Sequence, residues 1–318
     1  MAEGGAASLS LPGPLLITGA GGFVGRHVLA ALARLSPGTR VLTPATDITD
    51  RDAVRALFAA ERPAACLHLA AIAAIGVARG DPALAWSVNL HGTLAIAEAI
   101  RDLAPACRLI FVSSSDLYGA SFRCGEALDE QALPAPLNTY AATKAAADLA
   151  LGAMAAEGLS VLRLRPFNHT GPGQSDHFVV PAFARQIALA EAGRGPAVIR
   201  VGALAPERDF LDVRDVARAY LAAVAQAESL ASGTVLNIAS GVPRRIGDVL
   251  SSLLARAAVP IQVEEDVARL RPADIPRAVG DARQARDCLG WAPAIPWDVT
   301  LGDVLDDWRL RVRGDVLF

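Results

Sequence analysis

The sequence predicts an α/β protein with a doubly wound parallel sheet and a smaller C-terminal region. Short apolar runs alternate with longer Ala- and Leu-rich stretches from residue 15 to residue 166. The runs are continuously apolar, which is typical of parallel strands covered by helices on both faces. Hydrophobic residues make up 53% of the 318 residues, which is enough for a large core.

The strands are expected where the apolar runs are short and bounded by Gly, Pro, Ser or Asp. The run "RVLTP" is followed by only a few residues before the next helix, so one strand-helix unit is reduced there. A late run, "VLNIAS", can rejoin the sheet. We therefore expect strands over residues 15–18, 40–44, 65–71, 108–115, 160–166 and 235–240.

The helices are expected where apolar residues recur at helical spacing in good helix formers. Asn138 or Thr139 can cap the fourth helix, which follows two prolines. After residue 166, Gly, Pro and Asn become frequent. We expect helices over residues 23–35, 50–60, 83–100, 138–151 and 179–193.

Composition excludes several classes of protein. The net charge is −3 and no Lys/Arg-rich block occurs, so no nucleic-acid partner is expected. No run approaches 18 apolar residues and the N-terminal segment lacks a basic stretch before an apolar one, so we expect no membrane partner and a cytoplasmic location. The four cysteines form no CxxC pair, so buried thiols are expected and no metal site.

The segment "ITGAGGFVG" places Gly19, Gly22 and Gly25 after the first strand and at the start of a helix. Glycines let the backbone approach a pyrophosphate, and the helix N-terminus offers N–H groups to it. The alternative is a tight strand-helix turn. Because strand, glycines and helix come in the right order, we predict dinucleotide binding. We assign 1–166 to a dinucleotide-binding domain with a loose tail over 1–13, and 167–318 to the substrate-binding region, of which 206–240 partly returns to the first domain.

Lys144 is the only lysine of the chain, and Tyr140 lies four residues before it. On a helix, residues i and i+4 lie on one face, so the phenol and the ammonium can address the same volume. A cation beside a phenol lowers its pKa, which suits general acid catalysis. We predict a catalytic Tyr-Lys pair over the alternative of a solvated helix face.

With "SSSDLYG" and "YAATK", the G-x-x-G-x-x-G spacing resembles the extended short-chain dehydrogenase/reductase family of nucleotide-sugar enzymes, over nearly the whole chain. The resemblance implies a Rossmann fold, with Asp47 and Ile48 against adenine, and Ala70 and Ala71 lining the nicotinamide ribose. The cofactor residues that it implies are Gly19, Gly22, Phe23, Val24, Gly25, Asp47, Ile48, Leu69, Ala70, Ala71, Tyr140 and Lys144.

The choice between NADP and NAD depends on the end of the second strand. An acid there favours a free ribose 2′-OH, and a nearby arginine favours a 2′-phosphate. No acid directly follows "RVLTP", and Arg40 precedes it. We therefore favour NADP, with NAD as the alternative.

The resemblance also assigns catalytic roles. Ser114 matches the residue that hydrogen-bonds the substrate carbonyl oxygen, Tyr140 donates the proton, and Lys144 lowers the tyrosine pKa and binds the nicotinamide ribose. Asp116 stands where the family's 4,6-dehydratases carry a glutamate, and the shorter side chain counts against dehydration. Asp116 is either a catalytic carboxylate or a local cap.

The segment "RPFNHTGPGQSDHFVV" resembles the part of the family that binds the sugar nucleotide, and Asn168 stands where an asparagine holds the diphosphate. Phe178 and Val179 follow as substrate contacts, and Arg208 and Arg271 fit a diphosphate-binding role because guanidinium forks suit phosphate oxygens. His169, His177 and Asp209 are expected to make structural hydrogen bonds.

The resemblance is strongest to members that reduce GDP-4-dehydro-6-deoxy-D-mannose, so we expect NAD(P)H-dependent reduction of its C4 ketone to a GDP-6-deoxyhexose such as GDP-D-rhamnose. The alternatives are a nucleotide-sugar 4-epimerase or a GDP-mannose 4,6-dehydratase, both recycling the cofactor, and more remotely a non-catalytic dinucleotide sensor. Neither the stereochemistry at C4 nor the base follows from the residues. A homodimer is expected through the Ala-rich helices.

Overall fold

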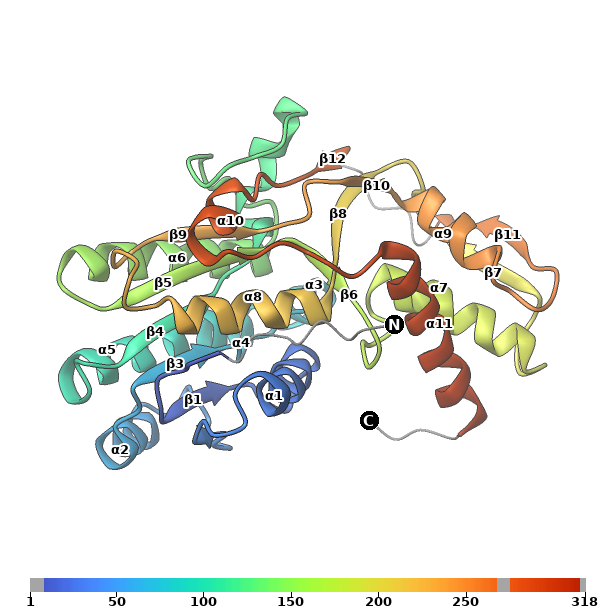
Figure 1. Cartoon of the computed structure of the whole chain (residues 1–318). Helices are drawn as coiled ribbons and strands as arrows, with labels where there is room; N and C mark the ends of the chain where they lie inside the picture. Colours follow the sequence, from blue (N-terminus) through green and yellow to red (C-terminus); the bar gives the residue numbers. More distant parts are fainter. Residues whose placement is uncertain (1–8, 268–274, 315–318) are drawn as a thin grey trace.

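The protein is built around a six-stranded parallel sheet, as predicted (Figure 1). The computed structural model describes residues 9–267 and 275–314. The strand order is β2-β1-β3-β4-β5-β9, so the chain winds outward in both directions from β1 and β3. The strands are β1 (Leu15–Thr18), β2 (Val41–Leu42), β3 (Ala65–His68), β4 (Arg108–Val112), β5 (Val161–Pro166) and β9 (Val235–Ile238).

Helices cover both faces of this sheet. On one face α8 packs against α1, and their apolar side chains share a core with Leu15 and Ile17. On the other face a second core joins Leu16 and Phe111 to the remaining helices. Continuous apolar strands are therefore buried on both faces. The helices are α1 (Phe23–Leu35) and α8 (Val213–Ala225), then α2 (Arg51–Glu61), α5 (Thr93–Leu103) and α6 (Thr139–Ala156).

Two predicted elements differ from those observed. The strand predicted over 40–44 contains only two residues, because it lies at the sheet edge and ends before Pro44. The helix predicted over 83–100 is interrupted by a π-helical turn, Ser87–Gly92, where the buried Asn89 side chain bonds to Ile72 and Thr143. The flanking helices are α3 (Ile75–Gly80), α4 (Pro82–Trp86) and α5.

The second half of the chain forms its own layer at the carboxyl end of the sheet (Figure 1). Helices α7 (Val179–Glu191), α9 (Ile246–Leu254) and α11 (Trp297–Arg313) enclose a third core. Strand β8 lies at the centre of a small sheet beside this core. The strands of this small sheet are β10 (Pro243–Arg245), β8 (Glu207–Asp212), β12 (Arg277–Ala278) and β6 (Asn168–Thr170). A separate two-stranded sheet pairs β7 (Val198–Val201) with β11 (Gln262–Glu265).

Segments of the second half return to the main sheet. Strand β9 is hydrogen-bonded to β5, and α8 lies across one face of the sheet. Helix α10 (Arg283–Leu289) packs against both, and the Trp291 indole N–H donates to the Asp215 carbonyl of α8 at 2.9 Å. The division into two domains at residue 166 stays a prediction.

Two expectations from composition concern the whole chain. In the described ranges, no helix combines the length and apolarity that a bilayer crossing requires. Cys66 and Cys107 are buried free thiols, as expected. Cys124, at the end of the 3₁₀ helix η2 (Ser115–Cys124), is exposed, so that expectation is wrong for this residue, and Cys288 is only partly buried.

Candidate active site

The glycine turn after β1 has the geometry of a phosphate cradle. Gly19 has φ +69°, and a Cβ there would lie 2.7 Å from the backbone nitrogen of Ala70. A Cβ on Gly25 would lie 2.4 Å from the carbonyl oxygen of Ala20. Helix α1 begins at Phe23 with Gly22 as its N-cap and no side chain capping it. Its first N–H groups can therefore bind an anion, and the turn fits a dinucleotide pyrophosphate.

The residues predicted to contact adenine lie beyond β2. The Asp47 carboxylate is exposed and accepts from the Thr49 N–H at 2.9 Å and the Thr49 hydroxyl at 2.8 Å, and these hydrogen bonds lower its pKa. Ile48 is buried against Gly92, where a Cβ would lie 2.7 Å from the Ile48 side chain. Asp47 is thus held ionised at the surface, and its contact with adenine stays a prediction.

Arg40 does not support NADP as we expected. It precedes β2, and its carbonyl accepts from the Leu15 N–H at the amino end of the sheet. Its guanidinium pairs with Glu61 at 2.8 Å. Dinucleotides bind at the carboxyl ends of such strands. The argument from Arg40 is therefore wrong, because the residue lies at the opposite end of its strand.

The segment after β3 is held rigidly beside the glycine turn. The Leu69 N–H donates to the Thr18 carbonyl at 3.2 Å, and the Ala70 N–H donates to the Thr18 hydroxyl at 3.3 Å. His68 is buried between Thr18 at 2.7 Å and Thr93 at 3.0 Å. Burial, with a smaller effect of the Lys144 charge, lowers the pKa of His68 to about 3, so the ring is neutral. Ala71 follows directly in this segment.

The predicted catalytic residues meet at the carboxyl ends of β4 and β5. Asn138 caps α6 by accepting from the Ala141 N–H at 2.9 Å, which places Tyr140 in the first turn. Ser114 follows β4, and its hydroxyl accepts from the Asp116 N–H at 3.2 Å. The Ser114 side chain lies close enough to Tyr140 to lower its pKa. The structure therefore brings Ser114, Asp116 and Tyr140 together.

Lys144 lies one turn further along α6 and is only 3% exposed. Its ammonium donates to the Val112 carbonyl at 2.6 Å and lies 4.4 Å from the centre of the Phe111 ring. Burial lowers the pKa of Lys144 to about 7, and the negative charge of Asp148 opposes this shift.

The expected lowering of the Tyr140 pKa by Lys144 is not what the structure shows. Burial raises the pKa of Tyr140, the Asp116 charge raises it further, and the hydrogen bond with Ser114 acts the other way. The Lys144 ammonium is directed to a backbone carbonyl of β4. This expectation is therefore wrong for the structure as it stands, since burial dominates over the i+4 spacing.

Arg208, in β8 of the second half of the chain, interacts with Asp116, which follows β4 of the main sheet. Burial raises the pKa of Asp116, and the positive charge of Arg208 opposes this rise. Burial lowers the pKa of Arg208, and the negative charge of Asp116 opposes that fall. The two side chains therefore interact across the site. In the described residues no hydrogen bond ends on the Asp116 carboxylate, and Ser114 is the cap of η2. The local-cap interpretation of Asp116 finds no support.

The other predicted substrate residues lie at the edge of the second half. Asn168 is exposed at the start of β6, opposite Phe210 of β8. Phe178 and Val179 are 38% and 36% exposed and form the N-terminus of α7. Arg271 lies outside the described residues. Their contacts with substrate stay predictions.

Three residues, Asp209, His169 and His177, were expected to make structural hydrogen bonds rather than to take part in catalysis. Asp209 accepts from Ser240, Gly241 and Gly280, which confirms its structural role. The His169 ring N–H donates to the Phe167 carbonyl at 2.9 Å, as expected for a loop histidine. Within the described residues the His177 ring makes no hydrogen bond, although its backbone N–H donates to the Ser175 hydroxyl.

A buried polar network behind the site was not predicted. The Asp148 carboxylate is fully buried between Arg163 at 3.0 Å and Arg165 at 2.8 Å. Arg165 also donates to the Tyr118 hydroxyl at 3.0 Å, which donates to Asn237 at 2.8 Å. The alternating arginines of "VLRLRP" in a buried strand were the available signal.

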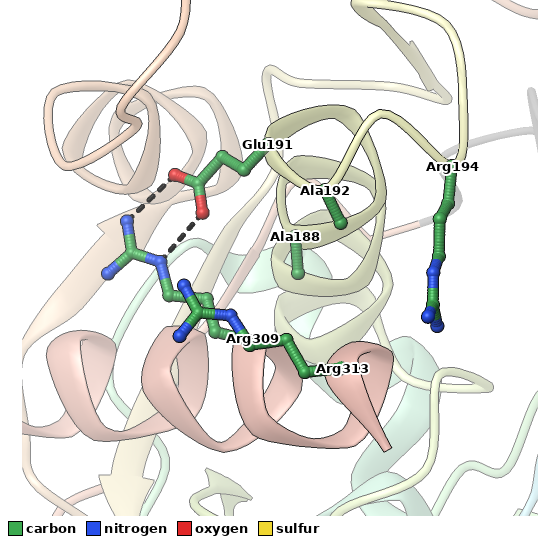
Figure 2. A pocket seen from close by; sticks show the side chains of 6 residues that line it. All are labelled: Ala188, Glu191, Ala192, Arg194, Arg309 and Arg313. Carbon is green, nitrogen blue, oxygen red and sulfur yellow. Dashed lines mark hydrogen bonds and ion pairs between the residues drawn. The ribbon is translucent and has the colours of Figure 1, made fainter. Parts of the chain in front are cut away.

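A cavity of about 290 Å³ lies elsewhere, between the C-terminal ends of α7 and α11 (Figure 2). Figure 2 shows Arg309 of α11 paired with Glu191 of α7, at 2.7 and 2.8 Å. Arg194 donates to the Val312 carbonyl near the end of α11. Arginines satisfy helix C-terminal carbonyls in this way, so we do not assign this cavity to the substrate.

The doubly wound sheet, the glycine cradle and the Ser114–Tyr140–Lys144 cluster define an NAD(P)-dependent oxidoreductase. Residues 15–239 match the NAD dependent epimerase/dehydratase family, and the chain belongs to this family. It is 37% identical to the GDP-6-deoxy-D-mannose reductase of Pseudomonas aeruginosa, over 94% of this chain and 98% of that protein. It is 30% identical to a UDP-glucose 4-epimerase of Streptomyces lividans, over 94% and 96% of the two chains.

A solved structure extends the comparison to three dimensions. The structure of RMD from Pseudomonas aeruginosa complexed with NADPH superposes with a TM-score of 0.85 at 34% identity. It covers 93% of this chain and 99% of that one. The similarity therefore spans both halves of the molecule.

Proposed function

We propose that this protein is an NADPH-dependent reductase that converts the C4 ketone of GDP-4-dehydro-6-deoxy-D-mannose to a hydroxyl, giving GDP-D-rhamnose. The observation that carries the proposal is the position of Tyr140 in the first turn of α6, close enough to Ser114 and Asp116 for both to act on its pKa. The Asp116 carboxylate thus lies within electrostatic reach of both a proton donor, Tyr140, and a cation of the kind that binds phosphate, Arg208. The GDP-6-deoxy-D-mannose reductase matched over nearly its whole length supports the choice of substrate.

The cofactor would lie along the carboxyl ends of the strands. Gly19, Gly22 and Gly25 would admit its pyrophosphate to the N-terminus of α1, with Phe23 and Val24 in the first turn. Lys144 would bind the nicotinamide ribose, and bound NADPH supplies the hydride. We favour NADPH because a relative at 34% identity is solved with it and because no acid directly follows β2.

The chain's own residues complete the reduction. Charge develops on the ketone oxygen as it becomes an alkoxide, so donors aimed at that oxygen stabilise the transition state more than the ground state. Ser114 would hold the oxygen and Tyr140 would give it a proton. The raised pKa of Tyr140 keeps the phenol protonated at neutral pH, as a donor requires.

An epimerase remains the second candidate because one relative at 30% identity is a UDP-glucose 4-epimerase. The test is NADPH and NADH oxidation with GDP-4-dehydro-6-deoxy-D-mannose made in situ, with UDP-galactose and GDP-mannose as controls. The reductase is supported if the amount of cofactor oxidised equals the amount of keto sugar added and if neither control sugar causes oxidation. Interconversion of UDP-galactose or dehydration of GDP-mannose without net oxidation would overturn it.

The pKa of Lys144 predicts how the rate depends on pH. Its ordinary pKa of 10.5 is lowered to about 7, so the ammonium form is lost as the pH rises through about 7, while Tyr140 stays protonated. We therefore expect kcat/KM for NADPH to fall above about pH 7. Lys144→Arg, whose guanidinium keeps its proton, should move this fall to higher pH. An unchanged profile in Lys144→Arg would show that another group titrates.

We also propose a homodimer formed through α6 and its neighbours. Leu149 is 56% exposed on α6, and Trp86 of the adjacent α4 is also exposed. Near Leu149 on α6, Ala153 is exposed and Ala146 and Ala150 are partly exposed, and these small side chains permit close helix packing. Wild-type protein should have the mass of a dimer in sedimentation, and Leu149→Glu should be a folded monomer. A monomeric wild type, or a dimeric variant, would contradict this. The cytoplasmic location expected from composition stays a prediction.

A further inference from the structure

We propose that Arg244 of β10 binds the diphosphate of the substrate together with Arg208, so that the two guanidinium groups form a clamp across the small sheet. Arg244 was not among the residues predicted from the sequence. The inference rests on the proposed function in one respect, that the substrate carries a nucleoside diphosphate. It adds a specific residue to that site.

The sheet register places the two arginines side by side. Strand β10 runs antiparallel to β8, and Arg244 is directly opposite Arg208. Directly opposite residues project from the same face with their Cβ atoms about 5 Å apart. Two like charges in this position repel each other unless an anion lies between them. The register therefore points to an anionic ligand on this face.

Aromatic packing holds Arg244 on the face that Arg208 shares. Phe210 lies two residues after Arg208 on β8 and so projects from the same face. The Trp297 ring stacks on Phe210 with 5.6 Å between centroids, and the Arg244 guanidinium carbon lies 4.8 Å from the Trp297 centroid. This stacking orients the guanidinium without using its N–H groups.

Both guanidinium groups keep donors for a ligand. Arg244 Nε is buried without a hydrogen-bond partner in the described part of the chain, and Arg208 donates one bond, to the Glu207 carbonyl at 2.7 Å. Burial lowers the pKa of both arginines. Nearby acids act on them through space: Asp116 on Arg208, and Asp209 and Asp298 on Arg244.

These acids leave the pair incompletely neutralised. Asp209 is already bonded to the backbone of Ser240, Gly241 and Gly280, and no ion pair of Arg244 occurs in the described ranges. Two partly buried cations with spare parallel donors match the oxygens of a diphosphate. Since the Arg208 charge also acts on Asp116, and Asp116 acts on Tyr140, the clamp would hold the diphosphate with the sugar directed to Tyr140.

The test is calorimetric binding of GDP, UDP, ADP and GMP to wild type, Arg244→Ala, Arg244→Lys and Arg245→Ala. Arg245 is the matched control, because it is the next residue, is exposed and projects from the other face. We expect Arg244→Ala to weaken GDP binding on the order of 10- to 100-fold, with a smaller loss for GMP. Arg244→Lys should retain part of the affinity and Arg245→Ala all of it.

The outcomes separate the clamp from the proposed function. Wild-type GDP affinity in Arg244→Ala, or equal losses for GDP and GMP, would overturn the clamp. A matching thermal unfolding temperature shows that the variant is folded, and Arg244→Lys repeats the test if Arg244→Ala is not. If wild type prefers UDP or ADP and Arg244→Ala weakens that nucleotide, the clamp stands and the GDP-sugar assignment fails. If wild type binds no nucleoside diphosphate, both fail.

Discussion

Tyr140→Phe is expected to lower kcat for ketone reduction by about 10³-fold while NADPH binds as tightly as to wild type. The phenol is the group that we place at the ketone oxygen, and it lies near Ser114 in the first turn of α6. General acid catalysis and a donor to a developing oxyanion each contribute about 10²- to 10³-fold or more. Phenylalanine keeps the ring, so packing is preserved. Steady-state kinetics and NADPH fluorescence titration measure the two effects separately.

Tyr220→Phe is the matched control. Tyr220 is fully buried in α8, and its hydroxyl has no hydrogen-bond partner among the described residues. Tyr220 lies near enough to Tyr140 for their charges to interact, but its hydroxyl makes no hydrogen bond within the described residues, so its loss should leave kcat near that of wild type. Turnover at the wild-type rate by Tyr140→Phe, or an equal loss in both variants, would refute the role of Tyr140 as acid.

Asp148→Asn is expected to lower the free energy of unfolding by about 3–5 kcal/mol, because removing one member of a buried ion cluster leaves the others uncompensated. Asp148 is 0% exposed and accepts from both Arg163 and Arg165. The amide keeps the shape and removes the charge. Urea unfolding followed by circular dichroism measures the change.

The same substitution should alter catalysis through Lys144. The negative charge of Asp148 raises the pKa of Lys144 against the effect of burial, so its removal lowers that pKa further. The fall of kcat/KM with pH should then begin at lower pH than in wild type. An unshifted profile would show that Asp148 acts on the fold alone.

Asp102→Asn is the control for stability. Asp102 is partly exposed and pairs with Arg55 and Arg101, each at 2.9 Å. Exposed pairs contribute only about 0–1 kcal/mol, so this variant should unfold close to wild type. Equal losses in Asp102→Asn and Asp148→Asn would contradict the special role of burial.

The elements of the fold that depend on neighbouring residues could be predicted from the sequence. Continuous apolar strands, the glycine turn of Gly19 to Gly25 and the cap at Asn138 are decided by neighbouring residues, and each formed as predicted. The spacing of Tyr140 and Lys144 likewise placed both on one helix. Short-range patterns therefore predicted the sheet and the helix of the site.

The remainder depends on contacts between residues far apart in the chain. Arg40 was predicted to favour a 2′-phosphate because it is close to β2 in the sequence, but the register of β2 places it at the amino end of the sheet. The electrostatic interaction of Asp116 with Arg208 connects residues 92 positions apart, and no local sequence pattern predicts such a contact. The Lys144 ammonium was assigned to Tyr140 by spacing, but burial and the Val112 carbonyl decide its charge and direction.

The most direct test of the reductase is the fate of the hydride. NADPH carrying deuterium at the transferred position should be incubated with GDP-4-dehydro-6-deoxy-D-mannose, and the sugar nucleotide analysed by mass spectrometry and proton NMR. Net reduction predicts one deuterium at C4 for each NADP⁺ formed. Recovery of the keto sugar without deuterium, with the reduced cofactor unconsumed, would contradict it.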